Sequence, residues 1–265
     1  MTFTASSSVG DPDLALLFYA SMRNIRRRQK STHNFIFRNS KQLQTWGSDP
    51  HSSMVLVNGS FQNRHVARDF AVDIIDLLVE EKIPVVWALK PKSDQPQEYT
   101  TTDVLKQLVS QVLRLNHSLL NERSASLNAA KFQSARTEQD WFNLLGSVLA
   151  GLPQVCIIVD LEALGRRGDD QPSWAYAFNV LFKELRSRQI PTVVKVAFMM
   201  YRTTPVAEFS DNLDNIINIP RKVPGKTKRN MYMPKNRAMH GARQMRTIKM
   251  AFFATNESTV GQKGI

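Results

Sequence analysis

The feature that most constrains this chain is a run of five apolar residues, 155–159, that leads directly into the carboxylate of Asp160. Gly151 and Pro153 precede the run, and Gly165 follows shortly after it. So short an apolar run predicts a strand buried on both faces, as in parallel sheets covered by helices. An acid at the carboxyl end of such a strand lies where open α/β sheets bind ligands. The alternative is that Asp160 simply ends a core strand.

Further apolar runs alternate with helical patterns along the chain. The expected strands are 54–57, 85–89, 154–160, 193–200 and 216–219, and the expected helices are 13–28, 66–78, 104–115, 138–150 and 174–188. Strands that alternate with helices predict an α/β fold, doubly wound, with a mainly parallel sheet of about five strands and helices on both faces.

The net charge of +12 is concentrated at the ends of the chain. Residues 221–265 hold 11 Lys/Arg against 1 Asp/Glu, and residues 1–53 hold 7 against 3, whereas residues 54–220 hold 17 against 19. We therefore expect a basic N-terminal helical segment (1–45), an α/β domain (46–220) and a basic, largely extended tail (221–265). Arg23 and Arg26 to Arg28 are expected at a solvated helix end, where cations favour the helix dipole.

The single cysteine and the absence of long apolar segments bear on location. Cys156 lies inside the central apolar run, which excludes a disulfide framework and favours a reducing compartment. No stretch reaches the roughly 20 apolar residues that a membrane helix needs. We expect a cytoplasmic or nuclear protein without a membrane partner, and the sequence leaves its oligomeric state open.

Five pieces of the chain, in this order, carry a resemblance to a known family. They are Phe37 to Trp46 before the first strand, Met54 to Gly59, Asp103 to Leu113, Trp141 to Pro153 before the Asp160 strand, and Val194 to Arg202. In this order and spacing, residues 35–220 resemble the NTPase core of fungal NACHT-type, or more broadly STAND-class, signalling proteins. The resemblance implies a P-loop NTPase-like fold, with Asp160 in the place of the Walker B aspartate that helps to hold magnesium.

The resemblance also assigns candidate nucleotide-binding residues. These are Gly59, Ser60, Asn63, Arg64 and His65 in the phosphate loop, Asp160 in the Walker B strand, and Arg202 as the sensor arginine. A working P-loop has the pattern GxxxxGK[ST]. Here Arg64, His65 and Val66 replace the second glycine, the lysine and the magnesium-binding hydroxyl. The Walker B side departs too, because Ala163 and Leu164 stand where the family has further acids, and Glu162 is out of register.

These departures predict a catalytically inert domain, not an enzyme, that acts as an interaction or regulatory module with a protein partner and without a resident cofactor. The histidines show no metal-ligand spacing, so no metal site is expected. Two alternatives stay open. One is a switch domain that binds ATP weakly through Arg64, the loop amides and Arg202 but does not hydrolyse it. The other is a nucleic-acid-binding protein whose basic tail contacts RNA or another acidic partner.

Deletion of residues 221–265 tests the expected domain organisation. Like charges repel, and the scattered apolar residues of this segment do not offset the ordering entropy of about 1–2 kcal/mol per residue. We expect the truncated chain to unfold within about 2 °C of the full chain in a thermal melt. A truncated chain that fails to fold would show that the segment is an integral part of the domain.

Overall fold

A computed structural model describes residues 11–29, 41–90, 100–116, 131–164, 174–201 and 216–219 of the chain. The helices are α1 (Pro12–Gln29), α2 (Lys41–Ser48), α3 (Arg64–Glu80), α4 (Thr101–Leu115), α6 (Glu138–Leu149) and α7 (Trp174–Ser187). The strands are β1 (Ser53–Asn58), β2 (Val85–Ala88), β3 (Gln154–Asp160), β4 (Val193–Met200) and β5 (Ile216–Asn218), and two short 3-10 helices are η1 (Phe61–Asn63) and η3 (Leu161–Leu164). The expected segment 221–265 and Arg202 lie outside the described residues.

The five strands form one parallel sheet in the order β2-β3-β4-β1-β5. This confirms the expected α/β architecture with a five-stranded parallel sheet. β3 lies between β2 and β4, so the strand that ends in Asp160 has neighbours on both sides. Asp160 is in register with Met199, which places its carboxylate at the carboxyl edge of the sheet.

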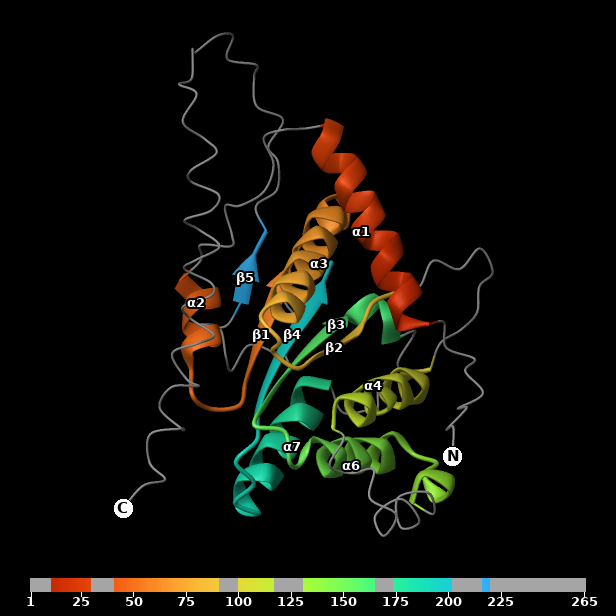
Figure 1. Ribbon diagram of the computed structural model, residues 1–265, viewed down its shortest axis with the longest axis vertical. Helices are drawn as coiled ribbons and strands as arrows, with labels where there is room; N and C mark the ends of the chain where they lie inside the picture. The colour runs from red at the N-terminus through yellow and green to blue at the C-terminus, as the bar shows by residue number, and fades with distance from the viewer. Residues whose placement is uncertain are drawn as a thin grey trace.

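Helices cover both faces of the sheet (Figure 1). On one face lie α1, α2 and α3, and on the other lie α4, α6 and α7. Along β3, Val155, Ile157 and Val159 contribute to one buried cluster, whereas Cys156 and Ile158 contribute to the other. Because both faces are dry, the strand needs apolar residues at every position, and this explains the unbroken apolar run.

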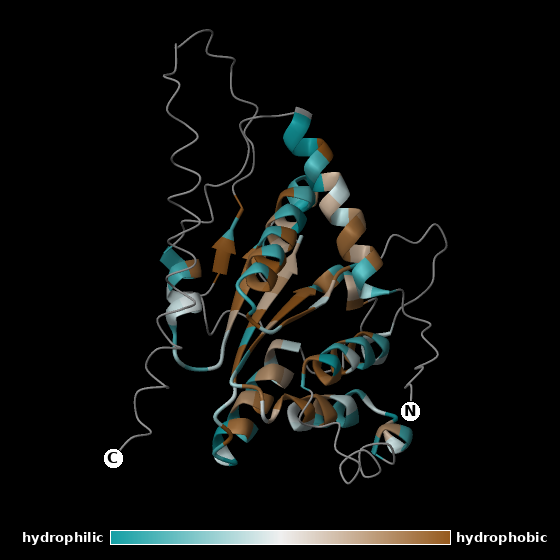
Figure 2. Ribbon diagram, viewed as in Figure 1, coloured by the Kyte–Doolittle hydropathy of each residue, from teal (hydrophilic) through white to brown (hydrophobic). Residues whose placement is uncertain are grey.

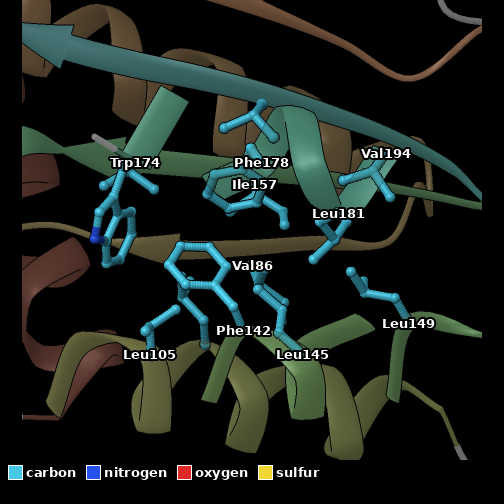
Figure 3. Close-up of a cluster of buried hydrophobic side chains, with 14 of the residues drawn as sticks. Val86, Leu105, Phe142, Leu145, Leu149, Ile157, Trp174, Phe178, Leu181 and Val194 are labelled. Atoms are coloured by element: carbon cyan, nitrogen blue, oxygen red, sulfur yellow. The ribbon is translucent and has the colours of Figure 1, made fainter. Parts of the chain in front are cut away.

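The α4, α6 and α7 layer packs through aromatic side chains (Figure 3). Phe142 of α6 lies between Trp174 and Phe178 of α7, with ring centroids 5.4 Å away from each in edge-to-face geometry. Phe178 in turn lies 5.8 Å from Phe198 of β4. Such pairs contribute about 0.5–1.5 kcal/mol each beyond their area burial. The helices of this layer are therefore tied to each other and to a central strand.

Capping boxes fix the starts of two helices in this layer. Thr137 accepts a hydrogen bond from the backbone amide of Asp140, and Asp140 accepts one from the amide of Thr137, as the sequence of α6 predicts. Thr100 and Asp103 make the same reciprocal pair at α4. In both cases the side chains satisfy amides that would otherwise lack partners in the first helical turn.

The arginines of α1 are only in part a solvated helix end. Arg23 donates hydrogen bonds to Asp73 at 2.8 Å and to Asp76 at 2.7 Å, and its residue is only 8% exposed. Arg26 pairs with Asp69, and Arg27 pairs with Asp73 at 2.6 Å. The expectation was wrong for Arg23, which is buried, and for Arg26, which is half-buried, because the acidic face of α3 lies under α1, a contact between segments that local pattern does not reveal. Arg27 is exposed as expected, although it also pairs with Asp73. Arg28 is exposed as expected.

None of the described helices is long and apolar enough to cross a membrane.

Lys195 of β4 is a buried cation at the amino-terminal half of the sheet. It is 1% exposed, and its ammonium group donates to the carbonyl oxygens of Asp49 at 2.5 Å and His51 at 2.8 Å and to the hydroxyl of Ser53 at 2.9 Å. All three ammonium protons thus have acceptors. Burial lowers the pKa of Lys195 to about 8, although the Asp49 carboxylate opposes this. Lys195 fixes the connection between α2 and β1 to the central strand.

The lowered pKa predicts that wild-type stability rises with pH relative to a Lys195→Met variant. Above pH 8 the folded chain releases the proton of Lys195, while the unfolded chain keeps it up to the ordinary value of 10.5, so the cost of burying charge falls as pH rises. Between pH 8 and 9.5, urea unfolding should show the wild type gaining about 1–2 kcal/mol over the variant.

Comparison with the Lys195→Met variant also controls for Cys156. Burial raises the pKa of this thiol to about 12, so its contribution to stability changes with pH in the opposite direction. That contribution is present in both proteins and cancels in the difference. A difference that stays constant over this pH range would contradict the prediction.

Candidate functional site

The candidate site lies where β1, β3 and β4 end at the carboxyl edge of the sheet. Asp160 ends β3 and is fully buried, at 0% exposure. Asn58 ends β1 and leads into the loop before α3, and Tyr201 follows the last residue of β4. The apolar strands bring these polar residues together because parallel strands end at the same edge.

Arg68 of α3 bridges the two acids of this edge. Its Nε donates to Asp160 Oδ2 at 3.2 Å, and its Nη2 donates to Glu162 Oε2 at 2.6 Å. The backbone amide of Glu162 donates to the other oxygen of Asp160, Oδ1, at 3.0 Å. Both oxygens of the buried carboxylate are therefore engaged within the chain. The ammonium group of Lys90 lies 3.8 Å from the same Glu162 oxygen and adds a second cation.

Two tyrosines enclose the guanidinium group of Arg68. Its central carbon lies 5.2 Å from the ring centroid of Tyr19 in α1 and 5.1 Å from that of Tyr201. The hydroxyl of Tyr19 donates to the carbonyl oxygen of Lys90 at 2.8 Å, which fixes the ring. Cations bind to aromatic faces most strongly when both are shielded from water. Three separate parts of the chain thus hold Arg68 in place.

The pKa shifts follow from this burial. Burial raises the pKa of Asp160, while the Arg68 guanidinium and the amide of Glu162 oppose the rise. Burial also opposes charge on Arg68, but the Asp160 carboxylate, the two tyrosines and Glu162 outweigh it and raise the pKa of Arg68 further above its usual range. Burial raises the pKa of both Tyr19 and Tyr201. Arg68 is a permanent cation at the one place where the sheet buries a carboxylate.

The loop that the resemblance assigns to phosphate is closed by backbone hydrogen bonds. The amide of Gly59 donates to the carbonyl of Met200 at 2.8 Å, the amide of Asn63 donates to Ser60 at 2.9 Å, and the amide of Arg64 donates to Phe61. A Cβ atom on Gly59 would lie 3.5 Å from Ile219 Cδ1, so side chains fill the space beside the glycine. These three amides are not available to an anion. The Ser60 hydroxyl oxygen is buried, and no partner for it lies among the described residues.

The remaining described residues of the predicted set, Arg64 and His65, lie in the first turn of α3. The Arg64 guanidinium stacks on Phe61, 3.8 Å from the ring centroid, and Phe61 itself is 64% exposed. His65 lies in the first turn of α3 and is half-buried. Among the described members of the predicted set, the structure thus gathers Gly59, Ser60 and Asn63 in the loop and gives Asp160 other partners.

Sequence reasoning missed Arg68, Tyr19 and Tyr201. Arg68 follows Arg64 by four residues and His65 by three, so it projects from the same face of α3, and this spacing was the available signal. The partner of Arg68 is 92 residues away along the chain, and no local pattern indicates that distance. Among the described residues, no group of three or more His, Cys, Asp or Glu side chains is placed to hold a metal ion.

Comparison of the chain with protein-family models, with curated proteins and with solved structures gave no match.

The ion pair of Arg68 and Asp160 predicts a large non-additivity in stability. Arg68→Met leaves a buried carboxylate without its cation, and we expect a loss of about 3–5 kcal/mol in urea unfolding. Arg68→Met combined with Asp160→Leu removes both charges, and we expect it to cost less than the sum of the single changes by more than about 1 kcal/mol.

Arg64→Met is the matched control on the same helix. Its guanidinium stacks on an exposed ring, and its loss should cost about 1 kcal/mol or less. Additive effects of Arg68→Met and Asp160→Leu would contradict the assignment of this pair.

Proposed function

We propose that this chain is a catalytically inert, P-loop NTPase-like domain of the STAND class that acts as an interaction or regulatory module. The observation that carries the proposal is the position of Arg68, whose guanidinium group contacts the carboxylate at the Walker B position. An internal cation then takes the place that a magnesium ion has in a working enzyme.

The arrangement of the strands supports the resemblance. β4 lies between β1, which precedes the phosphate-loop position, and β3, which carries Asp160. The strand that the resemblance assigns to the sensor thus lies between the strands assigned to Walker A and Walker B. The loop after β1 also enters a long helix, α3, directly at the position expected for the Walker A helix.

The side chains at this edge do not fit a nucleotide with magnesium. Magnesium requires oxygen ligands in near-octahedral geometry. Asp160 Oδ2 accepts from Arg68 and Oδ1 accepts from the Glu162 amide, and the carboxylate is fully buried, so a metal ion would have to compete with the Arg68 cation for it. Val66, at the position of the P-loop hydroxyl, is an apolar residue with 6% exposure. The amides of Gly59, Asn63 and Arg64 already donate to backbone carbonyls.

Asp160 keeps its carboxylate in this chain although the site does not fit a magnesium ion. A buried Asp160 without a cation would be costly, and Arg68 offsets that cost inside the chain. A domain arranged in this way holds its acid without a bound ligand and stays folded in one state. That property suits a module whose sheet stays folded while a protein partner binds at its surface.

Ligand-induced stabilisation tests the proposal. A ligand at 100 times its dissociation constant adds about 2.7 kcal/mol to folding. We expect thermal melts of the full chain to show no saturable shift with ATP or GTP up to millimolar concentration, with or without magnesium. An Asp160→Asn variant, which keeps the shape of the side chain, should respond in the same way as the wild type.

Two outcomes would overturn the proposal in different ways. Magnesium-dependent stabilisation with release of phosphate, lost in Asp160→Asn, would make the chain an active NTPase. Saturable stabilisation without phosphate release would favour the nucleotide-binding switch. In the second case, Arg64→Met should weaken the response if the predicted loop contacts the ligand.

A further inference from the structure

Helix α1 is attached to the domain by ion pairs together with a limited set of apolar contacts. Of its described side chains, Ala15, Tyr19 and Arg23 are buried, whereas α3 buries ten residues. Leu14 and Leu17, in the first half of α1, are 64% and 62% exposed. Leu16, Phe18 and Ala20 are partly buried and pack against the same core cluster. The hydrophobic contribution of α1 is still smaller than that of α3, because α1 buries fewer side chains completely.

The ion pairs between α1 and α3 form one connected set. Arg23 pairs with Asp73 and Asp76, Arg26 with Asp69, and Arg27 with Asp73. Asp73 therefore accepts from two arginines, and its side chain is 10% exposed. In Figure 2 the half of α1 that carries the arginines is mainly hydrophilic, and it lies along the hydrophilic side of α3.

The acidic face of α3 is continuous. Asp69, Asp73 and Asp76 follow one another at intervals of four and three residues, so they lie on one side of the helix. Close to them is the candidate site, because Tyr19 of α1 covers Arg68 and bonds to the carbonyl of Lys90. Release of α1 would expose both the three carboxylates and one side of Arg68.

We propose that α1 is a releasable cover of α3, and that the acidic face beneath it is a docking surface for an arginine-bearing amphipathic helix. The inference rests on the proposed function, since it names the surface and the partner chemistry of the interaction module. α1 itself shows the chemistry that fits: three arginines within five residues and a tyrosine four residues before the first of them. In the resting chain α1 occupies the surface and competes with a partner helix.

Competition within one chain favours α1. A helix that is joined to its own binding face acts at a high effective concentration, so a partner helix in free solution binds only when α1 is released or weakened. Helices held by few buried apolar contacts open at lower free energy than the core. The structure thus predicts opening of α1 while the sheet stays folded.

Hydrogen–deuterium exchange of the full chain tests the release of α1. Asp73→Asn removes the negative charge that Arg23 and Arg27 share, and we expect exchange in α1 to accelerate by about tenfold or more while exchange in β3 and β4 stays within about twofold. Glu80→Gln is the matched control, because it removes one negative charge from an exposed position of the same helix. Equal acceleration of α1 and the sheet, or no acceleration of either, would overturn the proposal.

A peptide with the sequence of residues 11–29 tests the docking surface. We expect its labelled form to bind saturably, by fluorescence anisotropy, to a full-length variant with Arg23, Arg26 and Arg27 changed to Gln, and to bind at least tenfold more weakly to the wild type. Adding Asp69→Asn and Asp73→Asn to that variant should abolish binding. A peptide that binds neither protein would overturn the proposed docking surface. If the arginine variant does not fold, the hydrogen–deuterium exchange experiment on Asp73→Asn still tests the release of α1.

The proposed function fails on a different result. Stabilisation by magnesium and ATP would contradict the proposal of an inert module, but it would leave the expected hydrogen exchange of α1 unchanged. If α1 does not open separately from the sheet, the proposal of a releasable cover is wrong, but the ion pair of Arg68 and Asp160 is unaffected.

Discussion

The structure depends on one unfavourable placement, a carboxylate at 0% exposure at the end of a central strand. An ionised carboxyl group in such a place destabilises the fold unless a cation and hydrogen-bond donors accompany it. Arg68 provides both, since its guanidinium group reaches Asp160 and Glu162 together. The rest of the edge is arranged around that bond: the Glu162 amide donates to the other oxygen, and two tyrosine rings shield the guanidinium group.

This arrangement links the core to the surface layer. Arg68 belongs to α3, which lies on the sheet, and Tyr19 belongs to α1, which lies on α3. Asp69, directly after Arg68, and Asp73 further along α3 pair with the arginines of α1. Charge on α3 thus acts in two directions, with a cation facing the buried acid and anions facing the outer helix. Helix α3 therefore contributes Arg68 to the polar site at the sheet edge while its apolar face packs in the core.

The sequence contained most of the fold but little of the site. All five strands were predicted because each is a short apolar run, and burial on both faces forces that pattern whatever the neighbours are. The long helices were predicted from their apolar periodicity. Helix α2 was not, since its eight residues are too few to show a repeat, and its place depends on Leu43 and Trp46 packing in the core. The strand order also lay beyond local pattern.

The site escaped prediction because its contacts join distant segments. The resemblance led to Arg64 and His65, which stand where a phosphate loop has its glycine and lysine, and both are half-buried in the first turn of α3. The residue that meets Asp160 is Arg68, one turn further along the same helix. Arginines of α1 were interpreted as solvated for the same reason, since their aspartate partners are more than 40 residues away.

Two buried cations at opposite ends of the sheet show how differently the chain uses charge. Lys195 meets mainly neutral acceptors, two carbonyls and a hydroxyl, and burial lowers its pKa to about 8. Arg68 meets two carboxylates, which outweigh burial and raise its pKa. The first cation therefore acts as a hydrogen-bond donor that ties a loop to a strand, and the second neutralises charge. At the carboxyl edge two acidic side chains meet Arg68, and in open α/β sheets that edge is where ligands bind. A cation that the chain itself supplies keeps the buried carboxylate paired without any bound ligand.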